Sequence, residues 1–295
     1  MPGSDTPALA PAWRGLVDDA AIFPPGNADL LDAADAYAAR LDRWYADLVA
    51  SFVVRDTDVP KLADFGGTQL PLSVVVTGGA GAISGALHLA GRNSATIAGL
   101  EIALRDLDDL AGNAQRVVAA VDAARADQIL EAETTVFVEL PQAEAGPAWL
   151  AAADVVAAAE LRLKFRTGGV EAHQFPSAST LAGWIDAALD RETPFKCTAG
   201  LHNAVRHTGD DGFEHHGFLN VLLATRLAFD GVAQDEVVAT LEQRDPATLS
   251  ADATDADLAG ARRWFTSYGS CSVIEPLDDL LALSLVEPAA TKERP

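Results

Sequence analysis

The chain has 295 residues, of which 49% are hydrophobic, and it carries a formal net charge of −22. This length suits one large domain or two modest ones, and the apolar fraction is ample for a core. A surface this acidic argues against nucleic acid or an anionic membrane as a partner.

Apolar runs alternate with Ala-, Leu- and Asp-rich stretches along the chain. The apolar runs predict strands at 15–17, 48–54, 72–76, 99–104, 135–140, 160–166, 194–198 and 269–274. The stretches between them predict helices at 28–45, 59–65, 81–92, 107–126, 148–159, 177–189, 217–229, 234–243 and 255–263. The helical pattern is clearest in 107–126, where apolar residues recur at helical spacing.

This alternation predicts a parallel sheet, because strands that are buried on both faces read as continuous apolar runs. Eight such units fit a (β/α)8 TIM-type barrel, with a helical insertion between Thr198 and Gly269, before the last strand. No convincing linker interrupts the pattern, so we expect a single barrel domain, 1–295. Its ends, 1–12 and 287–295, are expected to be disordered tails.

Two of the four lysines stand at matching places, each at the end of a predicted strand and each followed by glycine. They are Lys164, in ELRLKFRTGG, and Lys196, in TPFKCTAGLH. Since the chain has seventeen arginines, we would expect a plain surface cation to be arginine. A retained lysine indicates an amine that can lose its proton, because burial lowers the pKa of lysine and the neutral amine attacks carbonyls. The pattern favours Schiff-base chemistry.

The two lysines are expected to meet inside the barrel. Residues two apart on a strand share a face, so Lys164 and Arg166 point the same way, into the barrel. Lys196 faces inward on the next strand by the same alternation. At the C-terminal mouth, where catalytic groups of such barrels lie, each lysine would lower the pKa of the other. The alternative is that both form structural ion pairs with carboxylates such as Glu139 and Glu101.

These strand ends resemble those of the class I aldolases of the deoxyribose-phosphate aldolase type. That family carries a Lys-Thr-Ser-Thr-Gly strand end, then a Lys-x-x-Gly-Gly strand end, then a Gly-Thr-Ser segment. The matching segments here are 164–168 (KFRTG), 196–200 (KCTAG) and 269–272 (GSCS). The resemblance implies that Lys164 forms the Schiff base, that Lys196 depresses its pKa, and that glycines and hydroxyls bind an anion.

The chain departs from that family where a proton relay is needed. The family's Glu-Ile-Asp strand reads 101–103 (EIA) here, so Asp18 or Asp19, in the loop after the first strand, could replace the missing acid. His202 follows the second lysine strand, in place of an arginine-containing turn, and is a candidate general acid or base. Glu139, in a strand that resembles the family's fourth-to-fifth region, completes the candidate catalytic set. Because of these departures, deoxyribose phosphate is not the substrate we favour.

A substrate anion is expected at the same mouth, held by one arginine together with backbone amides and hydroxyls. The candidate anion-binding residues are Arg166, Thr167, Gly168, Gly169, Gly200, Gly269, Ser270 and Ser272. The sequence therefore predicts an aldolase-like lyase that acts on a small anionic carbonyl compound without a cofactor.

Two other motifs suggest different functions. The segment 74–85 (VVVTGGAGAISG) looks like the dinucleotide fingerprint of short-chain reductases, but Ser84 stands at its third glycine position and no lysine follows a Tyr at i−4. We expect it to be a loop of the barrel.

Histidines cluster between His202 and His216, where a divalent metal could bind. Their spacing matches no zinc signature, so we expect no tightly bound metal.

The runner-up function is a metal-dependent isomerase or hydrolase that uses the His202–His216 region, and the third is a non-catalytic ligand-binding barrel.

The two cysteines, Cys197 and Cys271, are too few for a disulfide framework, and we expect both to be packing residues. No apolar run is long enough to span a membrane, and the N-terminus shows no signal peptide, so we expect a cytoplasmic protein. Its expected partner is a small anionic substrate, and the sequence is compatible with a homo-oligomer.

Overall fold

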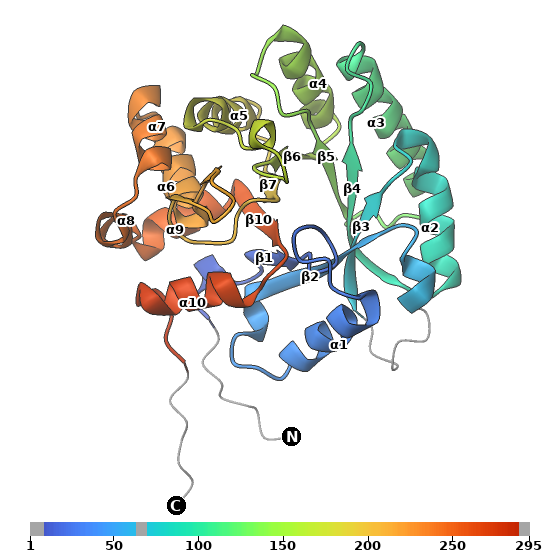
Figure 1. The fold of residues 1–295 in the computed structure, drawn as a ribbon. Coiled ribbons are helices and arrows are strands. Elements are labelled where there is room, and N and C mark those ends of the chain that lie inside the picture. Colours follow the sequence, from blue (N-terminus) through green and yellow to red (C-terminus); the bar gives the residue numbers. More distant parts are fainter. Residues whose placement is uncertain (1–8, 63–69, 289–295) are drawn as a thin grey trace, which may run out of the picture.

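The computed structural model describes residues 9–62 and 70–288 of the chain (Figure 1). Eight parallel strands close into a barrel in the order β1-β10-β7-β6-β5-β4-β3-β2, which confirms the predicted (β/α)8 TIM-type fold. The barrel strands are β1 (Val17–Asp19), β2 (Val49–Arg55), β3 (Pro71–Val76), β4 (Thr96–Ala103), β5 (Thr135–Glu139), β6 (Arg162–Arg166), β7 (Phe195–Thr198) and β10 (Phe265–Ser270).

Helices surround the barrel on its outside (Figure 1). They are α1 (Leu30–Arg40), α2 (Ile83–Arg92), α3 (Leu110–Ala126), α4 (Pro147–Ala158), α5 (Ala178–Asp190), α6 (Phe218–Phe229), α7 (Gln234–Glu242), α8 (Pro246–Asp252), α9 (Asp255–Arg262) and α10 (Ile274–Ala282). Side chains of Asp29, Asp109 and Ser177 accept backbone N–H groups at the starts of α1, α3 and α5. Such caps stabilise helix starts, whose first N–H groups have no partner within the helix.

The hydrophobic core lies between the barrel and its helices. Leu100 and Ile102 on β4 point outward and are fully buried, as are Leu163 and Phe165 on β6. Since successive side chains of a strand point to opposite faces, the residues between these positions face the inside of the barrel. The residues at these inward positions are charged or small, and they form a polar site inside the barrel.

The predicted insertion before the last strand is present. It begins after β7 with a hairpin of β8 (His207–Thr208) and β9 (Glu214–His215), and continues through α6 to α9. The first eight residues of α6 are all buried, because this helix is enclosed by α5, α7, α8, α9 and β10. The hairpin, α8 and α10 were not predicted from the sequence.

Arg262, at the end of α9, joins the first and last strands of the barrel. Its guanidinium donates to the carbonyl oxygens of Phe265 and Thr266 at the start of β10, and to those of Arg14 and Gly15 just before β1. Burial lowers the pKa of Arg262 to about 10. These contacts fix the seam at which a chain of eight strands has to close.

Two strand predictions are wrong in position. The first strand is Val17–Asp19 and not 15–17, because Gly15 has a φ of +57°, outside the extended region. The last strand is Phe265–Ser270 and not 269–274, where the chain turns into α10 at Ile274. The predicted helix 59–65 is a short 3-10 turn at Val59–Leu62, and 63–65 lie outside the described residues.

The predicted N-terminal tail is shorter than expected. Leu9 is buried, and Pro11–Trp13 form a 3-10 turn in which Ala12 and Trp13 are buried. These apolar side chains pack on the core, so the expectation of disorder is wrong for 9–12, while 1–8 lie outside the described residues. At the other end, Glu287 and Pro288 are exposed and outside any helix or strand, and 289–295 lie outside the described part.

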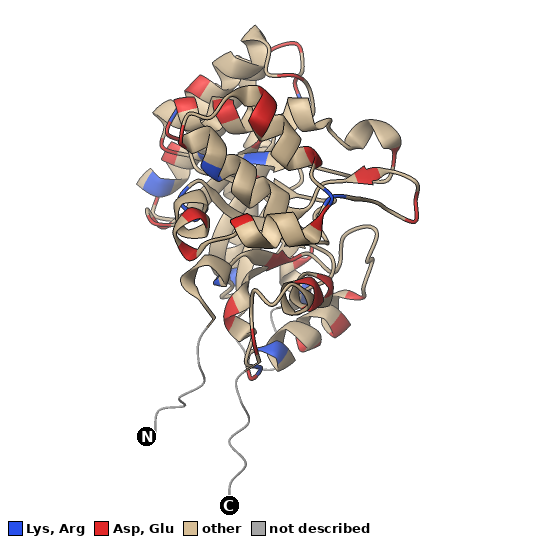
Figure 2. Cartoon of the chain, turned by 90° about the vertical axis from the view of Figure 1, so that its left-hand side faces the viewer, with Lys and Arg blue, Asp and Glu red and all other residues tan. Residues whose placement is uncertain are grey.

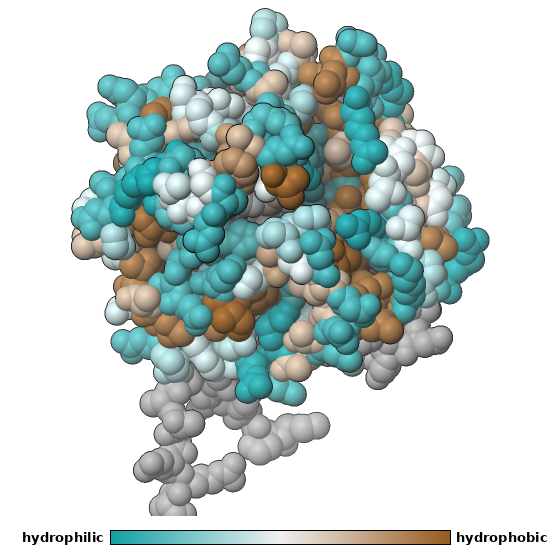
Figure 3. Space-filling view, in the orientation of Figure 1, coloured by the Kyte–Doolittle hydropathy of each residue, from teal (hydrophilic) through white to brown (hydrophobic). Residues whose placement is uncertain are grey.

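Acidic residues outnumber basic ones on the outer helices and loops of the face shown in Figure 2. On the face shown in Figure 3, hydrophobic residues form small groups between hydrophilic ones. Within the described ranges, no helix combines the length and the apolar character needed to cross a membrane.

Candidate active site

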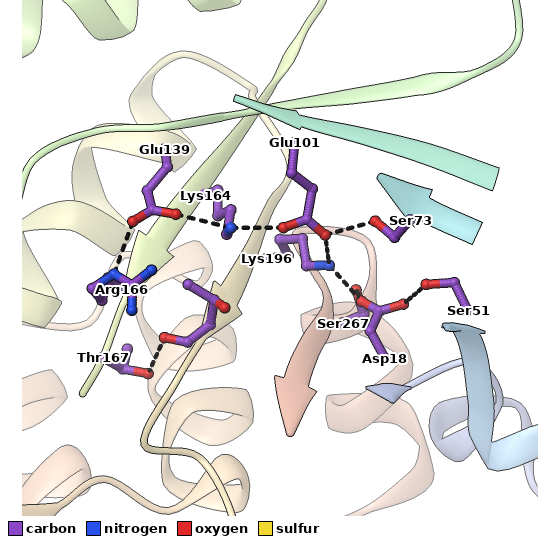
Figure 4. A network of polar contacts seen from close by, with 11 residues as sticks. Asp18, Ser51, Ser73, Glu101, Glu139, Lys164, Arg166, Thr167, Lys196 and Ser267 are labelled. Carbon is purple, nitrogen blue, oxygen red and sulfur yellow. Dashed lines mark hydrogen bonds and ion pairs between the residues drawn. The ribbon is translucent and has the colours of Figure 1, made fainter. Parts of the chain in front are cut away.

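The inside of the barrel holds a chain of alternating charges (Figure 4). Lys164 Nζ lies 2.6 Å from Glu101 Oε2 and 2.8 Å from Glu139 Oε2. Lys196 Nζ lies 2.6 Å from Asp18 Oδ2 and 2.8 Å from Glu101 Oε1. Glu101 therefore contacts both lysines, whose side chains are only 4% and 2% exposed. The interior of a barrel of this kind is ordinarily packed with branched apolar side chains, so this composition is unusual.

Hydroxyl groups and one arginine complete the network. Ser51 and Ser267 donate to the carboxylate of Asp18, at 2.5 and 2.7 Å, and Ser73 donates to Glu101 Oε1 at 2.6 Å. At the other end of the network, Arg166 Nε donates to Glu139 Oε1 at 2.9 Å. Buried charges are costly unless they are paired and hydrogen-bonded, and these groups meet both conditions.

The predicted meeting of the two lysines occurs, but its expected effect on their pKa values does not. Lys164 and Lys196 are register partners on neighbouring strands. Burial and the nearby Lys196 both act to lower the pKa of Lys164, but the carboxylates of Glu101 and Glu139 outweigh them and raise it above its ordinary value. Burial likewise acts to lower the pKa of Lys196, and Asp18 and Glu101 raise it.

The carboxylates respond in the opposite direction. Burial acts to raise the pKa values of Glu101 and Glu139, but the neighbouring cations lower both below the ordinary range. In the free protein, the network is thus a set of ion pairs, as in the alternative considered from the sequence.

A cavity of about 290 Å³ lies over this network at the C-terminal ends of the strands, and we name it the front cavity. Its charged lining consists of Glu101, Arg105, Glu139, Lys164, Arg166 and Lys196. Its apolar wall includes Phe23, Pro24, Val53, Val75 and Ala103. In a protein of net charge −22, the front cavity is lined by four cations and two carboxylates, and it therefore favours an anion.

The eight predicted anion-binding residues lie at this end of the barrel but do not form one cradle. Arg166, Gly169 and Gly269 line the front cavity. Gly168 and Gly200 instead pack against each other, so closely that a Cβ built on Gly168 would lie 2.7 Å from Gly200 Cα. Their role in the structure is this close approach of two strand ends.

The hydroxyls predicted for the anion site are engaged elsewhere. Thr167 donates its hydroxyl to the carbonyl oxygen of Ala199 at 2.5 Å. Ser270 donates to the carbonyl oxygen of Ser272 at 2.7 Å, and Ser272 Oγ accepts the backbone N–H of Glu275 at 3.2 Å. These contacts shape the turns after β6 and β10.

The two candidate relay acids separate to opposite faces of β1. Asp18 points into the barrel and contacts Lys196. Asp19 points outward, where it forms an ion pair with Arg40 of α1 and accepts the backbone N–H of Ala21. Adjacent residues on a strand cannot share a face, so only Asp18 reaches the network. The prediction of a catalytic Asp19 is therefore not supported by its position.

His202 lines the front cavity near its rim. Its Nδ1 lies 2.8 Å from Glu275 Oε2 at the start of α10, and its Nε2 lies 3.8 Å from Cys271 Sγ. Cys197 is buried as expected, whereas Cys271 lines the cavity and burial raises the pKa of its thiol.

The other three histidines of the insertion contact each other and neighbouring groups. His207 stacks on His215 with a centroid distance of 5.3 Å, and His215 also contacts Asp211. His216 contacts the carbonyl oxygen of Pro176 at 2.8 Å. In the described part of the chain, no group of three His, Cys, Asp or Glu side chains is arranged to hold a metal ion.

The glycine-rich segment 74–85 runs from the end of β3 through a 3-10 turn at Ala80–Ala82 into α2. A dinucleotide-binding sheet is open, and its ligand sits where the strand order reverses. The closed barrel has no such point, so the expectation that this segment is a barrel loop stands.

Sequence reasoning missed two groups of residues that the structure brings to the site. Glu101 was considered only as an ion-pair partner, although a lone carboxylate in the apolar run GLEIAL, two residues from Gly99 and Ala103, points inward. Ser51, Ser73 and Ser267 carry no motif, and only the closed barrel shows that they face Asp18 and Glu101.

No protein-family model matches the chain, and no curated protein matches it in sequence. Among solved structures, the fold is similar to that of a deoxyribose phosphate aldolase from Aeropyrum pernix, described as a unique tetrameric structure. The TM-score is 0.52 at 12% sequence identity, and the match covers 93% of this chain and 92% of that one. The chain therefore has an aldolase-like barrel, and at this identity the likeness is one of fold alone.

Proposed function

We propose that this protein is an aldolase-type lyase that forms a Schiff base between Lys164 and a small anionic carbonyl compound. The observation that carries the proposal is a buried amine that lines a cavity at the C-terminal mouth of a barrel, beside a second lysine and two carboxylates. Catalytic groups of (β/α)8 enzymes lie at this mouth. The aldolase-like fold agrees with the proposal.

Lys164 is the better nucleophile of the two lysines. Glu101 and Glu139 flank its amine, and both line the front cavity. The amine of Lys196 is held by Asp18 and Glu101, with the Phe137 ring centroid 5.1 Å away. We assign to Lys196 the role of a retained positive charge and proton donor beside the reacting carbonyl.

The amine of Lys164 has to become neutral before it can attack. Burial opposes the charged form of Lys164 and of both glutamates. When substrate displaces water from the cavity, a proton can move over 2.6 or 2.8 Å from Lys164 to Glu101 or Glu139, which replaces a buried ion pair by a neutral pair. The free amine then attacks the carbonyl carbon, and the nitrogen passes one proton to the second carboxylate. The carbonyl oxygen takes one proton from the carboxylic acid formed first and one from Lys196 and leaves as water, so that an iminium ion remains.

The substrate anion would be bound by arginine side chains. Arg166 uses Nε for Glu139 and is 36% exposed, so the rest of its guanidinium can reach a ligand in the cavity. Arg105 lines the same cavity from the segment after β4. Planar guanidinium groups suit a carboxylate or a phosphate. The apolar wall of Phe23, Val53 and Val75 would contact the carbon skeleton.

Borohydride trapping tests this function. The protein would be reduced in the presence of acetone, pyruvate and glyceraldehyde 3-phosphate in turn and digested for mass spectrometry. We expect a reduced adduct on Lys164 that is absent from Lys164→Arg, while Lys61→Arg, which changes an exposed lysine, keeps the adduct. An adduct confined to Lys196, or no adduct with any of a wide set of carbonyl compounds, would reject the proposal.

One observation favours a second candidate, a barrel that binds an anion without catalysis. The carboxylates that raise the pKa values of both lysines also hold them as ammonium groups. Such a protein would bind a carboxylate or phosphate ligand in calorimetry, and Arg166→Gln would weaken the binding, but borohydride would trap no adduct.

We further propose that the protein is cytoplasmic and can form a homo-oligomer. The similar aldolase is described as a tetramer.

A further inference from the structure

A second cavity, of about 200 Å³, lies at the N-terminal ends of the strands, and we name it the rear cavity. Small side chains make up most of its lining, among them Ser51, Ser73, Gly99, Thr135 and Ser267, and the larger Phe137 and Arg162 also line it. Branched apolar residues ordinarily fill this part of a (β/α)8 barrel. Here the strand starts leave a hollow that is lined by hydroxyl groups and therefore suits water.

The rear cavity reaches the charged network from behind. Lys196 lines both cavities, whereas Asp18 lines the rear cavity and Lys164 lines the front cavity. The hydroxyls of Ser51 and Ser267 donate to Asp18 and also line the rear cavity. A continuous set of hydrogen-bonding groups thus runs from the N-terminal face of the barrel to the amine of Lys196.

We propose that the rear cavity is the proton entrance of the site, and that Asp18 passes protons from its water to Lys196. This inference rests on the proposed function, in which Lys196 gives a proton to the departing oxygen of the substrate. The neutral Lys196 then takes a proton that Asp18 has first accepted from a rear-cavity water, and that water recovers its proton from solvent. Only protons move, so no oxidant or reductant is required.

The need for such an entrance follows from the geometry of the front cavity. A substrate bound over Lys164 excludes water from the front cavity, which removes the solvent contact of Lys196 on that side. The rear cavity is lined by residues at the opposite end of the barrel, so a substrate in the front cavity would not cover it. A site that is closed in front can therefore regain its proton from behind.

The four lysines of the chain make the proposal measurable. Protein labelled with 15N-lysine alone gives at most four side-chain ammonium signals, and buried, hydrogen-bonded ammonium groups exchange slowly enough with water to be followed by NMR. Thr135→Phe fills the rear cavity from the start of β5, and Thr135→Val, of nearly unchanged volume, is its matched control. Gly99→Val is a second filling variant, because a Cβ at Gly99 meets Ser73 Oγ at 3.3 Å and other atoms at ordinary contact distance.

We expect water exchange of the Lys196 ammonium to slow several-fold in Thr135→Phe and Gly99→Val and to stay unchanged in Thr135→Val. Exchange of Lys164 should be unaffected by these changes and should slow in Ala103→Phe, which narrows the front cavity. The proposal would be overturned if the exchange rate of the Lys196 ammonium stayed the same in Thr135→Phe and Gly99→Val but fell in Ala103→Phe. The measurement needs no turnover, so a rear entrance found in a protein that never forms a Schiff base would reject the proposed function alone.

Discussion

At the scale of single residues, Glu101 sets the charge state of the site, because its two oxygens each contact a different lysine. Replacing it by glutamine keeps the shape and removes the charge. Removing one partner of a buried ion pair leaves an uncompensated charge, which costs about 3–5 kcal/mol. We expect Glu101→Gln to lower the free energy of unfolding by this amount in urea titrations at pH 7.

A matched control for this substitution is Asp154→Asn, which removes a carboxylate that is 65% exposed and paired with Arg191. Exposed ion pairs contribute about 1 kcal/mol or less, so this variant should unfold almost like the unaltered protein. Equal stability of Glu101→Gln and the unaltered protein would show that the buried network is not charged as described.

Glu139 controls the proton of the nucleophile in the same way. Its carboxylate raises the pKa of Lys164, so Glu139→Gln should lower that pKa and leave more neutral amine at a given pH. With pyruvate as the probe, the rate of borohydride-trapped adduct formation should rise with pH in both proteins, and the rise should begin at lower pH in Glu139→Gln. Glu144→Gln, which changes an exposed glutamate nearby, should keep the original profile. Identical profiles for all three proteins would contradict the assigned role of Glu139.

The two lysines were predicted from the sequence, and ion pairs with Glu101 and Glu139 were predicted only as the alternative to a lowered pKa. The inward direction of Lys164 and Lys196 follows from alternation along a strand, which the sequence contains. Glu139 is the register partner of Lys164 on the neighbouring strand β5, whereas Asp18 and Glu101 come from β1 and β4, which are not paired with β6 or β7. The identity of these more distant partners depends on how the barrel closes. The sequence shows like charges on neighbouring strands, and only the fold shows Glu101 between them.

At the scale of elements, the seam between β1 and β10 depends on Arg262. Its guanidinium donates to four backbone carbonyl oxygens, and hydrogen bonds from charged donors contribute about 1.5–3 kcal/mol each. Arg262→Met keeps much of the length of the side chain but leaves these oxygens without the donor. We expect its free energy of unfolding to fall by about 3 kcal/mol or more, measured in urea.

The neighbouring Arg263→Met is the control for the seam, because Arg263 is exposed and stacks near Phe229 and Trp264. A surface change of this kind is expected to alter stability by about 0.5 kcal/mol. If Arg262→Met were no less stable than Arg263→Met, closure of the barrel would have to rest on the strand pairing alone.

The quality of the strand predictions follows from the composition of each strand. The six strands from β2 to β7 have apolar outward-facing residues that are buried under helices, and their predicted positions are close to the observed ones. The strand β10, Phe265–Ser270, reads FTSYGS and lacks an apolar run, so its prediction slipped toward the following residues. Hydrophobic pattern locates a strand only where its buried positions are filled by a run of apolar residues.

At the scale of the whole molecule, the barrel separates two environments. Apolar side chains fill the space between strands and helices, whereas the middle of the barrel holds a network of ion pairs and hydroxyls between two cavities. The count and order of the β and α units were enough to predict the architecture, because eight alternating units have few ways to close. The two cavities could not be predicted, since they depend on how small residues from different strands meet inside the closed barrel.

The loss of stability in acid should begin with His216, which attaches the insertion to the segment after β6. Burial lowers its pKa from 6.5 to about 4, and it contacts Pro176 O and the Arg206 guanidinium as a neutral ring. Because the unfolded chain binds this proton first, stability should fall as pH drops from 6.5 to about 4, by about 3 kcal/mol.

The carboxylates of Glu101 and Glu139 add a second stage to the loss of stability at low pH. Their pKa values in the folded protein lie below the ordinary 4.5, so the stability that they contribute is complete above that pH and is lost as pH falls through the folded values. We expect urea titrations from pH 7 to 3 to show both stages. His216→Gln should flatten the stage between pH 6.5 and 4 and keep the lower one, while His173→Gln, at an exposed histidine, should change neither. Constant stability of the unaltered protein between pH 7 and 5 would mean that His216 is not held neutral. If it is neutral in the folded protein, protonation of this histidine in the unfolded chain must lower the free energy of unfolding over this range.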